Sequence, residues 1–175
     1  MNLIFRLFYI FIKAVFGKRL RSPLEKSMIT LRVFPNDLDF NFHMNNGRYL
    51  TIMDLGRFDL TIIGKFYPLI LKNKLLPVVA SETIRFKKSL KLFQKFSLET
   101  QIIGWDEKWF FMQQTFFSNG EIIAEGLVKG ALKNRKNTFS PNQIIEEVYP
   151  NSSSPELPEK IIHWLKADEL LATTQ

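Results

Sequence analysis

One loop, residues 37–49, gathers more side chains able to hold or move a proton than any other stretch of the chain. Carboxylates and imidazoles can accept or donate protons, and amides can orient a water molecule or a carbonyl by hydrogen bonds. A catalytic hypothesis for this sequence therefore begins at this loop. Its chemistry-bearing side chains are Asp37, Asp39, His43, Asn45 and Asn46.

The sequence after this loop predicts a long, mostly apolar helix. Apolar or small residues recur at three- and four-residue steps from about residue 46 to residue 71, the spacing of a helix face. Asn45 or Asn46 is a suitable N-cap, and Pro68 predicts that the regular helix has ended or kinks by that point. The residues that recur are Tyr49, Ile52, Met53, Gly56, Leu60 and Ile63.

Strands are predicted on both sides of this helix. Residues 28–35 alternate as a first strand that Pro35 ends, and residues 77–132 are β-like in composition. Ser118-Asn119-Gly120-Glu121 has the composition of a type I′ hairpin turn. An apolar helix needs a cover, so we expect an α+β fold in which an antiparallel sheet wraps around one central helix.

The domain organisation follows from shifts in composition. Residues 27–137 form the predicted domain, and residues 1–22 form a basic, amphipathic segment in front of it. Residues 138–175 form a tail with helical patches at 141–148 and 158–171, which a Ser/Pro-rich break separates. The sequence contains no repeat and no sign of a second domain.

Composition limits the chemistry. The 175 residues include no cysteine, which excludes disulfides, thiol catalysis and cysteine metal sites. Because there are only two histidines, we also expect no other metal site, and we expect no cofactor. The net charge is +7, but residues 1–22 carry five basic and no acidic groups, leaving 24 − 5 = 19 basic against 17 acidic groups. The near balance argues against a nucleic-acid-binding surface on the domain.

The first 22 residues predict a helix with one narrow polar stripe. The apolar run is too short to span a bilayer, and no signal-peptide cleavage site follows it. We interpret it as a helix in a membrane interface, which would place a cytoplasmic protein peripherally on the inner face of a membrane. The alternatives are a helix packed on the domain or on a dimer partner, or an uncleaved signal anchor. The stripe consists of Asn2, Arg6, Tyr9, Lys13 and Gly17, and Lys18, Arg19 and Arg21 follow it.

Taken together, these motifs resemble the hotdog-fold thioesterases of the 4-hydroxybenzoyl-CoA type, and among them the thioesterase superfamily member 6 branch. The likeness covers roughly residues 27–147 and includes a hydrophobic leader in front of the domain. The His-Met-Asn-Asn segment is its most specific part. The motifs that carry it are Asp37-Leu-Asp39, His43-Met-Asn45-Asn46-Gly47-Arg48-Tyr49-Leu50, Ser89-Leu-Lys-Leu92, Gly104-Trp105-Asp106 and Ser140-Pro141.

The resemblance implies hydrolysis of acyl-CoA or acyl carrier protein thioesters by a homodimer, or a tetramer, with sites at the subunit interface. It implies Asp39 as general base or nucleophile, with His43 and Asn45 orienting the water or the carbonyl. The backbone N–H groups of Asn46 and Gly47 would polarise the thioester carbonyl at the helix N-terminus. The 17 Phe residues favour a long or bulky apolar acyl group, unless they only fill the core.

Arg85, Lys87 and Lys88 lie in a basic run that is a candidate contact for the CoA phosphates. A solvated turn at a sheet edge is the plainer interpretation of the same run. Asp37 is predicted to be structural, and Asp39 and His43 could also be turn residues. The rival function is a hotdog module that binds an acyl ligand, or a partner at a membrane, without catalysis.

Overall fold

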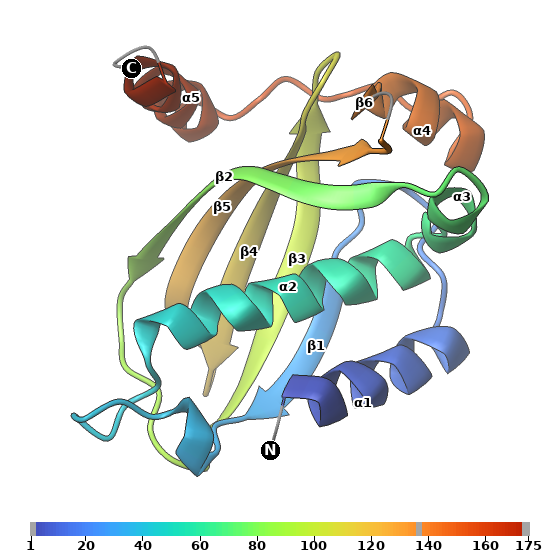
Figure 1. The fold of residues 1–175 in the computed structure, drawn as a ribbon. Helices are drawn as coiled ribbons and strands as arrows, with labels where there is room; N and C mark the ends of the chain where they lie inside the picture. Colours follow the sequence, from blue (N-terminus) through green and yellow to red (C-terminus); the bar gives the residue numbers. More distant parts are fainter. Residues whose placement is uncertain (1–2, 136–137, 173–175) are drawn as a thin grey trace.

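A curved antiparallel sheet wraps around a central helix, α2 (Asn46–Ile63), in the computed structural model, which describes residues 3–135 and 138–172 (Figure 1). The sheet order is β1-β3-β4-β5-β2, with β6 paired to β5 beside this path. The strands are β1 (Ser27–Arg32), β2 (Leu76–Phe86), β3 (Lys95–Trp105), β4 (Phe110–Ser118), β5 (Glu121–Lys133) and β6 (Thr138–Phe139). The remaining helices are α1 (Leu3–Phe16), η1 (Pro35–Asp37), α3 (Tyr67–Lys72), α4 (Pro141–Val148) and α5 (Glu159–Ala172).

The central helix lies close against the sheet because Gly56 faces it. A Cβ built at this position would come within 2.5 Å of the Thr100 hydroxyl oxygen on β3 and 2.9 Å of the Gln114 side-chain nitrogen on β4. The Gln114 side-chain amide also donates to the backbone oxygen of Met53 at 3.0 Å. The lack of a side chain at residue 56 thus lets the middle of α2 sit directly on two strands.

The helical pattern from 46 to 71 forms two helices rather than one. The backbone N–H of Gly64, the C-cap of α2, donates to the backbone oxygen of Leu60, and Lys65 adopts a positive φ of 62°. The chain therefore turns before α3 begins, ahead of the predicted break at Pro68. The β4–β5 turn agrees with its prediction, since φ is positive at both Asn119 and Gly120, as a type I′ turn requires.

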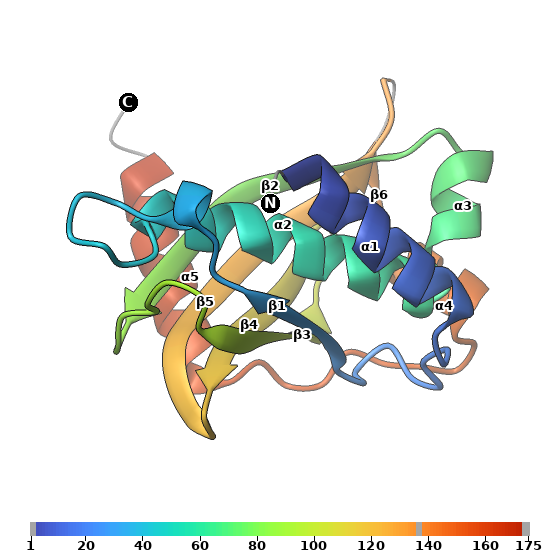
Figure 2. The same ribbon diagram turned by 90° about the horizontal axis from the view of Figure 1, so that it is seen from below.

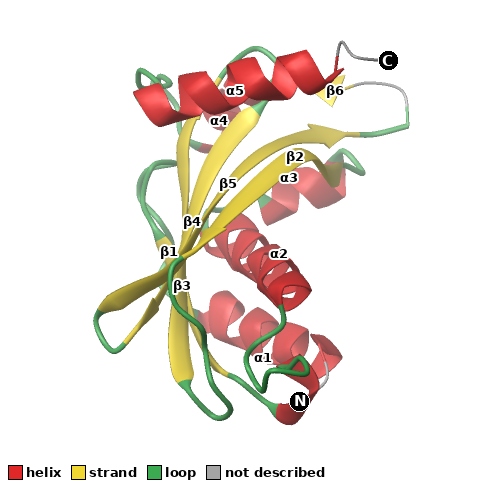
Figure 3. Ribbon diagram, turned by 90° about the vertical axis from the view of Figure 1, so that its left-hand side faces the viewer, coloured by secondary structure: helices red, strands yellow, loops and turns green. Residues whose placement is uncertain are grey.

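The two tail helices lie on different parts of the domain (Figures 1 and 3). Ile144 and Ile145 of helix α4 are buried in a hydrophobic cluster that also includes Leu60 at the end of α2. Helix α5 lies on the face of the sheet opposite to α2, where Asp168 pairs with Lys129 of β5 at 2.9 Å. The predicted boundary between residues 137 and 138 adjoins residues 136–137, which lie outside the described residues.

Helix α1 packs along α2, on the side of α2 away from β2 (Figure 2). Arg6, Ile10 and Ala14 of α1 are buried, and Ile10 belongs to the hydrophobic core between α2 and the sheet, with Ile52 and Leu98. The inner side of α1 is therefore packed on the domain, as one of the predicted alternatives has it. None of the helices in the described part of the chain is long and apolar enough to cross a membrane.

A carboxylate, Asp59, is buried on α2, where only 2% of its surface is exposed. Burial raises the pKa of Asp59 above its ordinary value, while the Lys13 charge and the Ser27 hydroxyl act in the opposite direction. The folded protein consequently holds this proton more tightly than the unfolded chain does. The free energy of unfolding therefore falls as pH rises through the interval between the two pKa values.

Asparagine cannot ionise, so we expect the free energy of unfolding of Asp59→Asn not to fall in this way as pH rises. Urea unfolding of variant and wild type from about pH 4 to pH 7 should show a difference in stability that grows with pH in favour of the variant. The exposed carboxylate substitution Glu156→Gln serves as the control and should give no such trend. A difference that is flat with pH, or that shrinks as pH rises, would contradict this account of Asp59.

Candidate functional site

The predicted catalytic carboxylate, Asp39, lies in the loop between η1 and α2 and is half-buried. Its Oδ1 accepts the backbone N–H groups of Asn41 at 2.9 Å and His43 at 3.3 Å. The backbone N–H of Asp39 in turn donates to the carbonyl of His43 at 2.8 Å. This tight turn fixes the carboxylate in position while leaving it reachable from solvent, as a base or a nucleophile requires.

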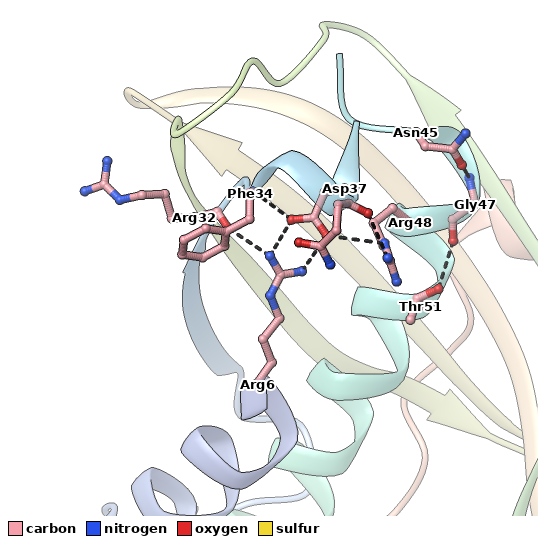
Figure 4. Close-up of polar contacts among 9 residues, drawn as sticks. Arg6, Arg32, Phe34, Asp37, Asn45, Gly47, Arg48 and Thr51 are labelled. Carbon is pink, nitrogen blue, oxygen red and sulfur yellow. Dashed lines mark hydrogen bonds and ion pairs between the residues drawn. The ribbon is translucent and has the colours of Figure 1, made fainter. Parts of the chain in front are cut away.

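Two residues earlier, Asp37 is fully buried and holds the loop in place (Figure 4). The Arg6 guanidinium of α1 binds both oxygens of this carboxylate, with Nη1 3.0 Å from Oδ1. Arg48 Nε lies 3.2 Å from Oδ1, and the backbone N–H of Phe34 donates to Oδ2 at 2.8 Å. Asp37 is thus saturated by internal partners, as its predicted structural role requires.

Asn45 caps the central helix. Its side-chain oxygen accepts the backbone N–H of Gly47 at 2.9 Å, and its backbone N–H donates to the carbonyl of Asp37 at 2.8 Å. The Gly47 amide, predicted as an oxyanion donor, is therefore engaged by the cap in this structure. Asn46 is the first residue of α2, where the helix dipole favours negative charge.

His43 links the loop to the basic run that follows β2. It forms an isolated antiparallel bridge with Lys91, and the backbone N–H of the next residue, Met44, donates to the carbonyl of Leu90 at 2.8 Å. The fold thereby brings two segments that are about 50 residues apart in sequence side by side. A ligand that reaches the loop would also lie near the basic run.

The structure places the three residues predicted to contact phosphate at the end of β2 and just beyond it. The side chain of Lys87 pairs with Glu125 at 2.5 Å, and that of Lys88 pairs with Glu121 at 2.6 Å. Arg85 is exposed on β2 and lies opposite Glu125 in the strand register. Two of these cations thus already have carboxylate partners, with which a phosphate would have to compete.

A cavity of about 390 Å³ opens between the C-terminal half of α2, α3 and the sheet. Its walls are almost entirely apolar, with Arg57 and Asp54 as charged residues at its edge. Its size is that of a small-molecule site. The remaining lining residues are Phe58, Leu60, Thr61, Phe66, Tyr67, Ile70, Pro77, Val78, Val79, Ile102, Phe110, Met112, Gly130, Ala131 and Leu132.

None of the predicted catalytic residues lines this cavity, because the loop precedes α2 whereas the cavity lies along its second half. The residues that line this cavity were not predicted from the sequence. Its lining comes from four strands and two helices, and only the abundance of Phe hinted at an apolar chamber. Within residues 3–135 and 138–172, no group of three His, Asp or Glu side chains could hold a metal ion.

Comparison with known proteins decides the family. Residues 33–165 match the thioesterase-like superfamily. The chain belongs to this superfamily. Protein THEM6 of Danio rerio is 33% identical over 162 residues, which cover 90% of this chain and 78% of that protein. Protein THEM6 of Xenopus laevis is 35% identical over 141 residues, which cover 78% of this chain and 66% of that protein.

Solved structures agree on the fold. The probable thioesterase YbaW of Escherichia coli superposes with a TM-score of 0.65 at 18% identity, covering 70% of this chain and 96% of that one. The protein SAV2348 of Staphylococcus aureus, solved in complex with CoA, gives a TM-score of 0.60 at 19% identity, with coverages of 79% and 92%. The predicted hotdog fold is confirmed, and superfamily membership supports the predicted enzyme class, a thioester hydrolase.

Proposed function

We propose that the protein hydrolyses acyl-CoA thioesters with a long apolar acyl group, using Asp39 as general base or nucleophile. The observation that carries the proposal is the carboxylate of Asp39, held by two backbone N–H groups in the loop that leads into α2 of a thioesterase-like chain. A thioester carbonyl is electrophilic enough for a carboxylate to activate water against it, or to attack it directly, without a metal. The CoA thiolate then leaves and takes up a proton. After direct attack, water hydrolyses the anhydride formed between the acyl group and Asp39, which releases the acid and restores the carboxylate.

The N-terminus of α2 supplies the matching electrostatics. The first amides of a helix have no intrahelical acceptor, and their dipoles favour an oxyanion that develops nearby. In this proposal Asn46 donates its backbone N–H to the oxyanion, whereas the Gly47 amide must first leave the side chain of Asn45. His43, half-buried in the same loop, would orient the water or the acyl carbonyl.

The acyl group would occupy the apolar cavity of a second copy of the chain. β2 is an edge strand with exposed Leu76, Val79 and Phe86, so it can pair with its counterpart in a two-fold dimer. α2 and β2 run in opposite directions in Figures 1 and 2. A two-fold axis at β2 therefore directs the start of one α2, with its loop, toward the second half of α2 in the partner.

The nucleotide part of CoA would lie against the basic run. Lys91 is bridged to His43, and Lys88 follows β2 in the same segment, so phosphates bound there would be near the loop. The similar fold of SAV2348 was solved with CoA, which supports a CoA ester over other thioesters as the first substrate to test. Acyl carrier protein esters remain the second class in the panel.

The proposal is tested by measuring thiol release from a panel of acyl-CoAs, from short to long chains, together with a benzoyl ester. We expect turnover to rise with chain length until the acyl group fills the apolar cavity. Absence of turnover across the panel, with tight acyl-CoA binding by calorimetry, would contradict hydrolysis. That result would favour the rival function, a hotdog module that binds acyl ligands without catalysis.

A further inference from the structure

Outside the site, α1 carries an exposed apolar surface. Nine of its large hydrophobic residues face solvent, with Phe5, Phe8 and Phe16 between 63% and 86% exposed. Contiguous apolar surface of this kind marks an interaction site in a soluble domain. The nine are Ile4, Phe5, Leu7, Phe8, Tyr9, Phe11, Ile12, Val15 and Phe16.

The two cations of α1 in the described residues are engaged with the domain and not with this surface. Arg6 is 1% exposed and is paired with Asp37. The side chain of Lys13 donates to the backbone oxygen of Met28 on β1 at 2.8 Å. The sequence predicted a polar stripe on this helix, and the structure turns its two cations toward the protein. The apolar face is therefore the outer one.

Positive charge borders the C-terminal end of this face. Lys18 and Arg21 are exposed there, whereas Arg19 donates to the carbonyls at the ends of α1 and α2. No acidic residue occurs in the first 22 residues. If the same segment of a second copy packed on this face, it would bring only positive charges close to Lys18 and Arg21. An anionic lipid surface would bring the complementary negative charge.

The loop before α2 carries further exposed apolar residues, near the opposite end of α1. In Figures 1 and 2 it lies beside the N-terminal end of α1, in agreement with the contact between Arg6 and Asp37. Phe40 and Phe42 in this loop are among the most exposed hydrophobic residues of the described chain. Aromatic side chains of this kind are suited to the boundary between headgroups and acyl chains.

We propose that α1 lies flat on an anionic bilayer, with Phe5, Phe8 and Ile12 buried between the lipids and Lys18 and Arg21 among the headgroups. The loop tip with Phe40 and Phe42 would contact the same surface. This proposal does not rest on hydrolysis. If the protein both hydrolyses long-chain acyl esters and lies on a bilayer in this way, the loop that carries Asp39 faces the bilayer, where such esters accumulate.

The test is co-sedimentation of the full chain with phosphatidylcholine vesicles, with and without about a third phosphatidylserine. Deletion of residues 1–22 is unsuitable because it also removes Arg6 and Ile10 from the domain. The variant Phe5→Gln/Phe8→Gln changes only exposed side chains, and Leu71→Gln/Leu171→Gln is the control because these leucines are 60% and 76% exposed elsewhere.

We expect the wild type and the leucine control to bind anionic vesicles, and the phenylalanine variant to partition at least about tenfold more weakly. Lys18→Gln/Arg21→Gln should lower binding to anionic vesicles by about fivefold per charge and leave binding to neutral vesicles unchanged. Wild-type protein that stays in the supernatant with anionic vesicles would overturn the proposal. So would wild-type oligomers that dissociate in the phenylalanine variant, since a second copy would then cover the face.

Discussion

Asp39→Asn should lower kcat for acyl-CoA hydrolysis by about 10² or more and leave the Kd for the substrate nearly unchanged. Asparagine keeps a side-chain oxygen that can accept the N–H groups of Asn41 and His43, so the loop should retain its shape. It cannot accept a proton from water or form an acyl intermediate as a carboxylate does. Thiol-release kinetics, with calorimetry for binding, measure both quantities.

Asp106→Asn is the matched control for this experiment. The Oδ1 of Asp106 also accepts two backbone N–H groups in a turn, those of Lys108 at 2.8 Å and Trp109 at 2.7 Å. This turn joins β3 to β4 and carries no proposed chemistry, so its substitution should leave kcat unchanged. Equal kcat values for Asp39→Asn and the wild type would contradict a role of Asp39 as base or nucleophile.

The second large effect is expected on stability, at the contact between α1 and the loop. Arg6→Ala leaves the buried carboxylate of Asp37 without its main counter-charge, and Arg48, at 3.2 Å, is then its remaining charged partner among the ion pairs of the described residues. Breaking a buried pair from one side typically costs about 3 kcal/mol or more. Urea unfolding should show this loss, and activity should fall with it because the same loop holds Asp39.

Arg21→Ala, at an exposed arginine, is the control and should change stability by less than about 0.5 kcal/mol. The double variant Arg6→Met/Asp37→Asn removes both charges and keeps an oxygen acceptor for the backbone N–H of Phe34. It should recover part of the loss, because no buried carboxylate is left without its counter-charge, and Arg48, which loses its partner, is partly exposed to water. If the double variant is as unstable as Arg6→Ala, then lost packing, not the unpaired carboxylate of Asp37, explains the effect.

Much of the fold was predictable because local patterns determine it. The spacing of Tyr49, Ile52 and Met53 predicted the central helix, and Asn45 proved to be its cap. The Asn119-Gly120 pair predicted the hairpin between β4 and β5. The predicted site residues Asp39, His43 and Asn45 do lie together in one loop, as their closeness in sequence requires.

Long-range features were not predictable from the same patterns. The inward direction of Arg6 depends on Asp37, 31 residues away, and a helical wheel contains no such information. The bridge between His43 and Lys91 depends on where β2 ends. The apolar cavity is likewise assembled from elements spread over residues 54–132. Each of these required the folded arrangement of the sheet around α2.

In the proposed dimer, Asp39 of one copy acts on an acyl group held in the cavity of its partner. We would test this arrangement by mixing two inactive variants: Asp39→Asn, and Thr61→Trp, which fills the cavity from α2. After unfolding and refolding together, mixed dimers would contain one intact site, so thiol release should recover to about a quarter of the wild-type rate. If the mixture forms mixed dimers and remains inactive, the carboxylate and the cavity do not combine across the interface, and the proposed site is wrong.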